Sequence, residues 1–138
     1  MMKIKYIISI ESKLEQNILM GRIISKLEDE YYIIVDKSID TVLFKDDSWQ
    51  IRPQNKIFSK IDKGKFEVSA LDYGKLITIT YYVSFLPEVV TTTILVVISI
   101  VVQNYFVILI SMPLLIQLLV RISTLKSVIN QMLKRLAI

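Results

Sequence analysis

Residues 89–120 read VVTTTILVVISIVVQNYFVILISMPLLIQLLV, a run of thirty-two residues without one charged side chain. The hydrocarbon core of a bilayer is about 30 Å thick, and a helix needs about 20 apolar residues to cross it. An uncharged block of this length is typical of a membrane protein and not of a soluble domain. The block is too long for one upright crossing and slightly short for two full crossings, so other features have to decide the arrangement.

Three arrangements fit the apolar run. A single helix would be about 48 Å long at 1.5 Å per residue, and it would put its two flanks on opposite sides of the membrane. A hairpin turning at Gln103 and Asn104, the most polar step in the run, gives two arms of about 19 residues if they extend to Ser84 and Ser123. A re-entrant hairpin has the same turn and differs only in depth. The length of the run favours a hairpin over a single span.

The charge distribution gives the orientation. All thirteen acidic residues and thirteen of the seventeen Lys and Arg lie at or before Glu88, so the first 88 residues sum to zero. The net charge of +4 comes from four later residues, Arg121, Lys126, Lys134 and Arg135. Cations without acids, directly after an apolar segment, mark a cytoplasmic flank. We therefore expect a two-pass protein of a bacterial cytoplasmic (inner) membrane with both termini in the cytoplasm, and Glu88 is expected to pair with Arg121 at the interface.

The residues before the apolar run predict one strand and one helix. Residues 3–10 alternate as a strand does, with Ile4, Tyr6, Ile8 and Ile10 on one face. Ser12 followed by Glu15 matches a capping box, which predicts that a helix begins there. The helix is expected to end at residues 28–30, where three acids oppose the helix dipole. Its apolar stripe consists of Leu14, Ile18, Met20, Ile23, Ile24 and Leu27.

Further strands are predicted up to the membrane. They comprise residues 31–35, 41–45, 49–52, 56–61, 65–71 and 75–84. Residues 62–64 and 72–74 are turn signals for two hairpins. Tyr81, Tyr82 and Phe85, directly before the membrane, fit an aromatic belt at the interface. The first residues show no export signal, so we expect this part to lie in the cytoplasm.

The predicted fold class is α+β. Residues 1–86 form a cytoplasmic domain in which one helix covers an antiparallel sheet, in the order strand, helix, meander. Residues 87–120 form a two-helix transmembrane hairpin that turns near residues 103–104. Residues 121–138 form a basic amphipathic C-terminal helix that continues the second membrane helix.

A heptad seam supports this continuation across the membrane boundary. The seam residues are spaced three and four apart and comprise Leu115, Leu118, Ile122, Leu125, Ile129, Met132 and Leu136. Three partners fit the seam: the chain's own first domain, another copy or a larger membrane protein, and the bilayer surface. Docking is favoured over lying flat, because the spacing is regular and the cations are few.

The composition removes most site chemistry. The chain contains no His and no Cys, so the commonest general base, the commonest transition-metal ligand, thiolate chemistry and zinc sites are not expected. The three glycines form no phosphate-binding loop, and the acidic clusters at residues 28–30 and 46–47 have no convergent partners. We expect no catalytic residue, no cofactor and no metal site. The neutral first domain also argues against nucleic acid as a partner.

The resulting hypothesis is a non-enzymatic integral membrane accessory or assembly protein, which acts through contacts with its own copies or with a larger membrane complex. A pore-forming, holin-like protein is a second hypothesis, and the folded first domain argues against it. A membrane-tethered domain that covers a lipid chain between its helix and sheet is a third. Membrane lipid is a partner in all three.

Overall fold

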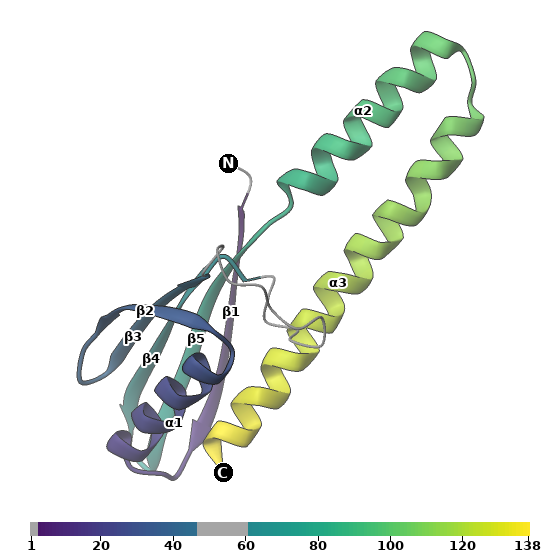
Figure 1. The fold of residues 1–138 in the computed structure, drawn as a ribbon. Coiled ribbons are helices and arrows are strands. Elements are labelled where there is room, and N and C mark those ends of the chain that lie inside the picture. Colours follow the sequence, from purple (N-terminus) through teal and green to yellow (C-terminus); the bar gives the residue numbers. More distant parts are fainter. Residues whose placement is uncertain (1–2, 47–60) are drawn as a thin grey trace.

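The computed structural model describes residues 3–46 and 61–138. This part of the chain has the α+β fold that was predicted, with a five-stranded antiparallel sheet and three helices (Figure 1). The elements in chain order are β1 (Lys3–Ser12), α1 (Gln16–Asp29), β2 (Tyr32–Lys37), β3 (Thr41–Asp46), β4 (Lys63–Leu71), β5 (Gly74–Ser84), α2 (Leu86–Val102) and α3 (Phe106–Ala137). The strand predicted at residues 49–52, and residues 56–60 of the next one, lie outside the described residues.

The strand order in the sheet is β1-β5-β4-β3-β2. The last four strands form the predicted meander, and β1 joins it by pairing with β5 from Lys3 opposite Ser84 to Ser12 opposite Lys75. Residues on facing strands share one side of the sheet. Most apolar residues therefore collect on one face, while the other carries Lys, Thr and Glu side chains together with Ile7, Ile33, Leu43 and Leu76.

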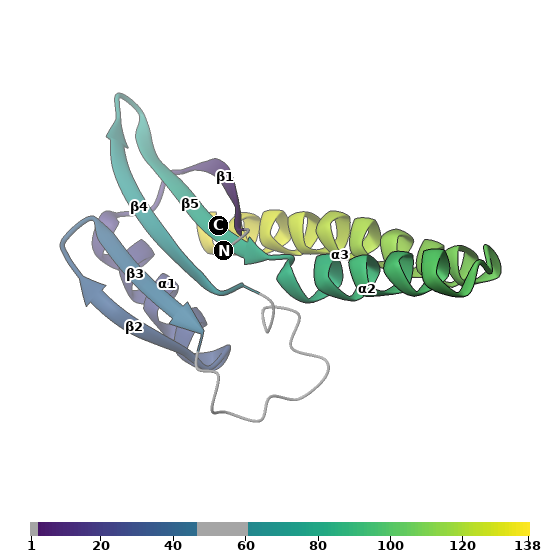
Figure 2. The same cartoon turned by 90° about the horizontal axis from the view of Figure 1, so that it is seen from above.

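One hydrophobic core joins the sheet, α1 and the C-terminal part of α3. Helix α1 packs on β2, β3 and β4, and α3 packs on β1 and on α1. The fully or nearly buried helix residues are Leu19, Met20, Ile23 and Leu27 of α1 and Leu125, Ile129, Met132, Leu133 and Leu136 of α3. Residues 121–138 thus belong to the same core as the sheet. Beyond the sheet, α2 and α3 run side by side as a long arm (Figure 2).

The prediction that Ser12 begins the first helix is wrong. Ser12 is the last residue of β1 and is buried, and α1 begins at Gln16 with Glu15 as its N-cap. The Ser12 Oγ accepts a hydrogen bond from the backbone N–H of Leu14 and donates one to the carbonyl oxygen of Ala137, at the end of α3. A contact with a residue so distant in the sequence cannot be read from a local capping pattern. The predicted end of the helix is confirmed, since α1 ends at Asp29.

The two turn signals have different outcomes. Residues 72–73 do form the turn between β4 and β5, with Leu71 opposite Gly74. Residues 62–64 do not form a turn, because Lys63 and Gly64 are paired within β4. Gly64 lies opposite Phe44, and the ring of Phe44 occupies the space that a Cβ at position 64 would need. The glycine here serves close packing of an aromatic ring, not chain reversal.

The predicted aromatic belt is wrong for two of its three residues. Tyr81 and Phe85 are buried in the core, with Tyr81 only 1% exposed. The ring of Tyr81 stacks on that of Tyr6 at 5.2 Å between centroids. An alternating strand places every second aromatic residue on the core face, and Tyr81 occupies such a position beside Gly64. Tyr82, one residue later, lies on the opposite face and is half-buried.

Burial raises the pKa of Tyr81 to about 12, and the neighbouring Tyr6 adds to the shift. The unfolded chain ionises this phenol near pH 10, so its contribution to stability is complete below about pH 10 and is lost as the pH rises toward about 12. Replacement by Phe (Tyr81→Phe) removes this ionisation. We expect the variant to lose less stability than the wild type between about pH 9 and about pH 11. Thermal unfolding at both pH values checks this, and equal losses would contradict it.

Candidate functional site: the helical arm and its junction with the sheet

The arm turns at the residues that the sequence indicated. Helix α2 ends at Val102, Gln103 adopts a left-handed conformation with φ 51°, and α3 begins at Phe106. The carboxamide oxygen of Asn104 accepts a hydrogen bond from the backbone N–H of Phe106, and the Ser99 Oγ donates one to the carbonyl oxygen of Asn104. These bonds satisfy backbone groups that helix ends leave without partners. The turn is therefore tied down by its own polar side chains.

The contact between α2 and α3 uses small and polar residues as well as apolar ones. Ser99 of α2 and Ser111 of α3 are the buried polar residues of the arm, and the Ser111 Oγ donates to the carbonyl oxygen of Ile108. Thr92 and Thr93 likewise donate to backbone carbonyls four residues earlier, at 2.8 Å. Small residues allow two helices to approach closely, and hydroxyl groups bonded within their own helix tolerate an apolar environment.

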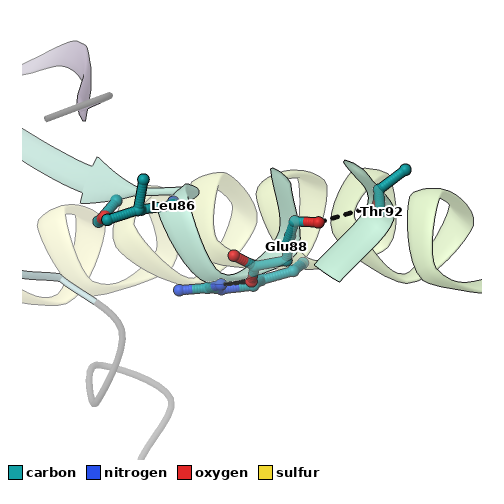
Figure 3. A network of polar contacts seen from close by, with 5 residues as sticks. Leu86, Glu88 and Thr92 are labelled. Carbon is teal, nitrogen blue, oxygen red and sulfur yellow. Dashed lines mark hydrogen bonds and ion pairs between the residues drawn. The ribbon is translucent and has the colours of Figure 1, made fainter. Parts of the chain in front are cut away.

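An ion pair joins the two helices at the base of the arm. Arg121 of α3 donates from Nη1 to Oε1 of Glu88 in the first turn of α2. The sequence predicted these two residues as a pair, and the structure brings them together. Figure 3 shows Glu88 at the start of α2 together with Leu86 and Thr92, whose hydroxyl bonds the Glu88 carbonyl. The side chains of Arg121 and Glu88 are only 19% and 26% exposed, so the pair is largely shielded from water.

The lower half of α3 docks on the chain's own sheet domain. Ile129 and Leu133 are fully buried there, next to the stripe of α1. Two further contacts hold the last turn of α3: Ser12 donates to the carbonyl oxygen of Ala137 at 2.7 Å, and Arg22 donates to that of Leu136 at 3.4 Å. A helix end leaves its final carbonyls without partners, and a nearby cation also favours the helix dipole. Neither contact is predictable from the sequence, because neither residue type indicates a partner so far along the chain.

The predicted seam is divided between two partners in the structure. Leu125, Ile129, Met132 and Leu136 are buried against the sheet domain, and Leu118 and Ile122 are partly buried at its edge. Leu115 is 43% exposed and lies outside this stripe. Ser111 is buried and Leu114 is half-buried, and these two positions extend the stripe along the side of α3 that contacts α2. One face of α3 thus contacts α2 on the N-terminal side of Arg121 and the sheet domain on the C-terminal side.

Helix α3 is long and apolar enough to cross a membrane, and only 6% of its apolar stretch is buried inside the structure. The apolar part of α2, Glu88–Val102, is shorter than such a span requires. In residues 3–46 and 61–138, no group of three or more acidic side chains is placed to hold a metal ion.

Comparison with known proteins gives no relative for this chain: no family model, no curated protein and no solved structure matches it.

Proposed function

We propose that the protein is a non-enzymatic membrane protein whose α2–α3 arm inserts as a hairpin and acts by contacting other membrane protein chains, either further copies or a larger complex. Its sheet domain and C-terminus would share the cytoplasmic side. The observation that carries this proposal is the surface of the arm. Large apolar side chains cover it and are left exposed, among them Ile94, Val97, Ile100 and Val101 of α2 and Leu109, Met112, Ile116 and Leu119 of α3.

The contacts within the arm support a hairpin. A single span through α3 would have to separate Arg121 from Glu88, or carry that ion pair into the hydrocarbon core, where charges are strongly unfavourable. With the pair at the interface, the part of α2 that enters the membrane, Glu88–Val102, measures about 22 Å at 1.5 Å per residue, which is about 8 Å less than the hydrocarbon core, so the bilayer has to thin locally or the hairpin is re-entrant. The hydroxyl groups of the arm are bonded within the arm, as an apolar environment requires.

The docked position of residues 121–138 changes where a partner is expected. The seam below Arg121 packs on its own domain, so the surface left for another chain is the apolar outside of the arm. The inner face of the sheet is filled by α1 and α3, which argues against an acyl chain between helix and sheet. The holin-like alternative has no specific observation in its favour.

Single cysteines test the placement, because the natural chain has none. Tyr105→Cys probes the turn, and the exposed residues Asp72→Cys and Lys134→Cys probe the domain and the tail. In intact cells we expect an impermeant maleimide to label Tyr105→Cys, and to label the other two only after the membrane is opened. Labelling of Asp72→Cys and Lys134→Cys from opposite sides would contradict the hairpin. Protection of Tyr105→Cys from both sides would replace a spanning hairpin by a re-entrant one.

The same approach tests the contact function. Ile116→Cys lies on the exposed surface of the arm, and Ser111→Cys lies on the buried side toward α2 and serves as the matched control. If the partner is a second copy, oxidation in native membranes is expected to form a disulfide between two Ile116→Cys chains. If the partner is a larger protein, a photoactivatable maleimide attached to Ile116→Cys is expected to cross-link to it in a fixed ratio. Ser111→Cys is expected to give neither product. Adducts with lipid alone at Ile116→Cys would argue against protein contacts as the function.

A further inference from the structure

The face of the sheet opposite α1 and α3 is not covered by any of the described helices and carries a row of lysines. Lys5 of β1 lies opposite Tyr82 of β5, Tyr82 lies opposite Lys63 of β4, and Lys63 lies opposite Lys45 of β3. These four residues, here called the lysine row, therefore cross four adjacent strands in one line. Neighbouring strands are about 4.8 Å apart, so Lys45 and Lys63 are direct neighbours, and Lys5 follows across the Tyr82 ring.

The row is unfavourable for the sheet in the absence of a ligand. Like charges directly opposite each other on an antiparallel pair are destabilising, and Lys45 and Lys63 are such a pair. Other lysines of the same face have acidic partners: Lys3 pairs with Asp62 at 3.1 Å and Lys65 with Glu67 at 2.5 Å. Among the described residues, no carboxylate forms an ion pair with Lys5, Lys45 or Lys63. Within the described part of the chain, these three cations thus lie together without an ion-pair partner of their own, and the nearby Glu67 is paired with Lys65.

The row lies in a hollow of about 600 Å³. Besides the row, the hollow is lined by the ion pair of Lys65 with Glu67, by Thr80, and by Val35, Leu43, Phe44 and Gly64. The Nζ of Lys63 lies 5.2 Å from the centroid of the Tyr82 ring, which holds this ammonium group over the floor of the hollow. Ammonium groups and hydroxyl donors around a concave surface suit a phosphate group, which accepts several charge-assisted hydrogen bonds.

The row also lies at the end of the sheet from which the arm departs. Tyr82 precedes the first residue of α2 by four positions, and Figure 1 shows the end of β5 leading directly into α2. An extended chain covers about 13 Å over four positions, and the Debye length at physiological ionic strength is about 8 Å. If the arm is inserted, the ammonium groups therefore come within electrostatic reach of the membrane surface where the lysine side chains extend toward α2.

We propose that the lysine row binds the phosphate headgroups of anionic lipids in the membrane that the arm enters. This inference rests on the proposed insertion of the arm. Basic residues close to an anionic membrane surface each strengthen binding by about fivefold. Since the arm already fixes the depth and orientation of the sheet domain, the expected role of the row is to select anionic lipids.

The test uses the full chain in mixed micelles of phosphatidylglycerol and phosphatidylcholine, with native mass spectrometry of the lipids it retains. The variant Lys5→Gln/Lys45→Gln/Lys63→Gln removes the row. The matched control Lys13→Gln/Lys37→Gln/Lys75→Gln removes the same charge from the far end of the sheet. We expect the wild type and the control to retain phosphatidylglycerol preferentially, and the row variant to lose at least about tenfold of that preference.

Equal preference in the two triple variants would overturn the proposal. Displacement of the lipid by millimolar inorganic phosphate would also overturn it, because the site would then be one for a soluble anion. If the row variant has a lower melting temperature than the control variant, the single variants Lys63→Gln and Lys75→Gln are compared. A lipid preference of Lys63→Gln equal to that of Lys75→Gln then counts against the proposal. A loss of lipid preference does not bear on insertion. A chain that the cysteine labels place outside the membrane refutes the proposed function separately.

Discussion

Replacing Ile129 by alanine is expected to lower the free energy of unfolding by about 2–5 kcal/mol, the range for removing a large aliphatic side chain from a packed core. Ile129 is 0% exposed and lies where α3, α1 and the sheet share one hydrophobic core. The substitution leaves a cavity at the contact that fastens α3 to the domain. Denaturant unfolding of the full chain in mild detergent, monitored by near-ultraviolet circular dichroism of the tyrosines, measures the change in the free energy of unfolding.

The neighbouring substitution Asn130→Ala is the control, because Asn130 is exposed on the same turn of α3. It is expected to change the free energy of unfolding by less than about 0.5 kcal/mol. If Ile129→Ala were equally mild, α3 would not be docked on the domain as described, and residues 121–138 would be free to meet a different partner.

Replacing Arg121 by glutamine is expected to destabilise the chain by about 1–3 kcal/mol, because Glu88 is then left shielded from water without its cation. Glu88→Gln should have an effect of similar size. The double variant Glu88→Gln/Arg121→Gln should recover part of the loss, since a neutral pair has no uncompensated charge. The Nε of Arg121 and the Oε2 of Glu88 have no hydrogen-bond partner among the described residues, so the native pair is not fully satisfied and a neutral pair competes well.

A double-mutant cycle over Glu88 and Arg121 gives the coupling energy directly. We expect at least about 1 kcal/mol in detergent, measured by thermal unfolding. Strictly additive effects of the two substitutions would mean that the pair contributes nothing to holding α2 against α3.

Much of the fold could be predicted because it is encoded by local periodicity. Alternation gave the strand at residues 3–10, the three acids at residues 28–30 marked the end of α1, and the polar step at Gln103 and Asn104 marked the turn of the arm. Such signals depend on near neighbours in the chain, which a single sequence displays.

The features that were missed depend on partners far apart in the sequence. The role of Ser12 is set by Ala137, and the need for glycine at position 64 is set by the ring of Phe44. The predicted seam included Leu115 because an apolar repeat does not contain a serine. The buried position on the side toward α2 is Ser111. The lysine row appears only when the register of four strands is known, since its members are separated by up to 77 positions, from Lys5 to Tyr82.

Helix α3 continues without interruption from the turn at the tip of the arm to the core beneath the sheet. The domain is therefore fastened to the arm twice, through the short junction after β5 and through the docked half of α3. A domain on a single flexible linker swings independently of its anchor, whereas two fastenings remove that freedom. If the arm is inserted as proposed, any tilt that a thicker or thinner bilayer imposes on it is transmitted as a rotation of the whole sheet, so that the arm and the sheet move as one rigid body.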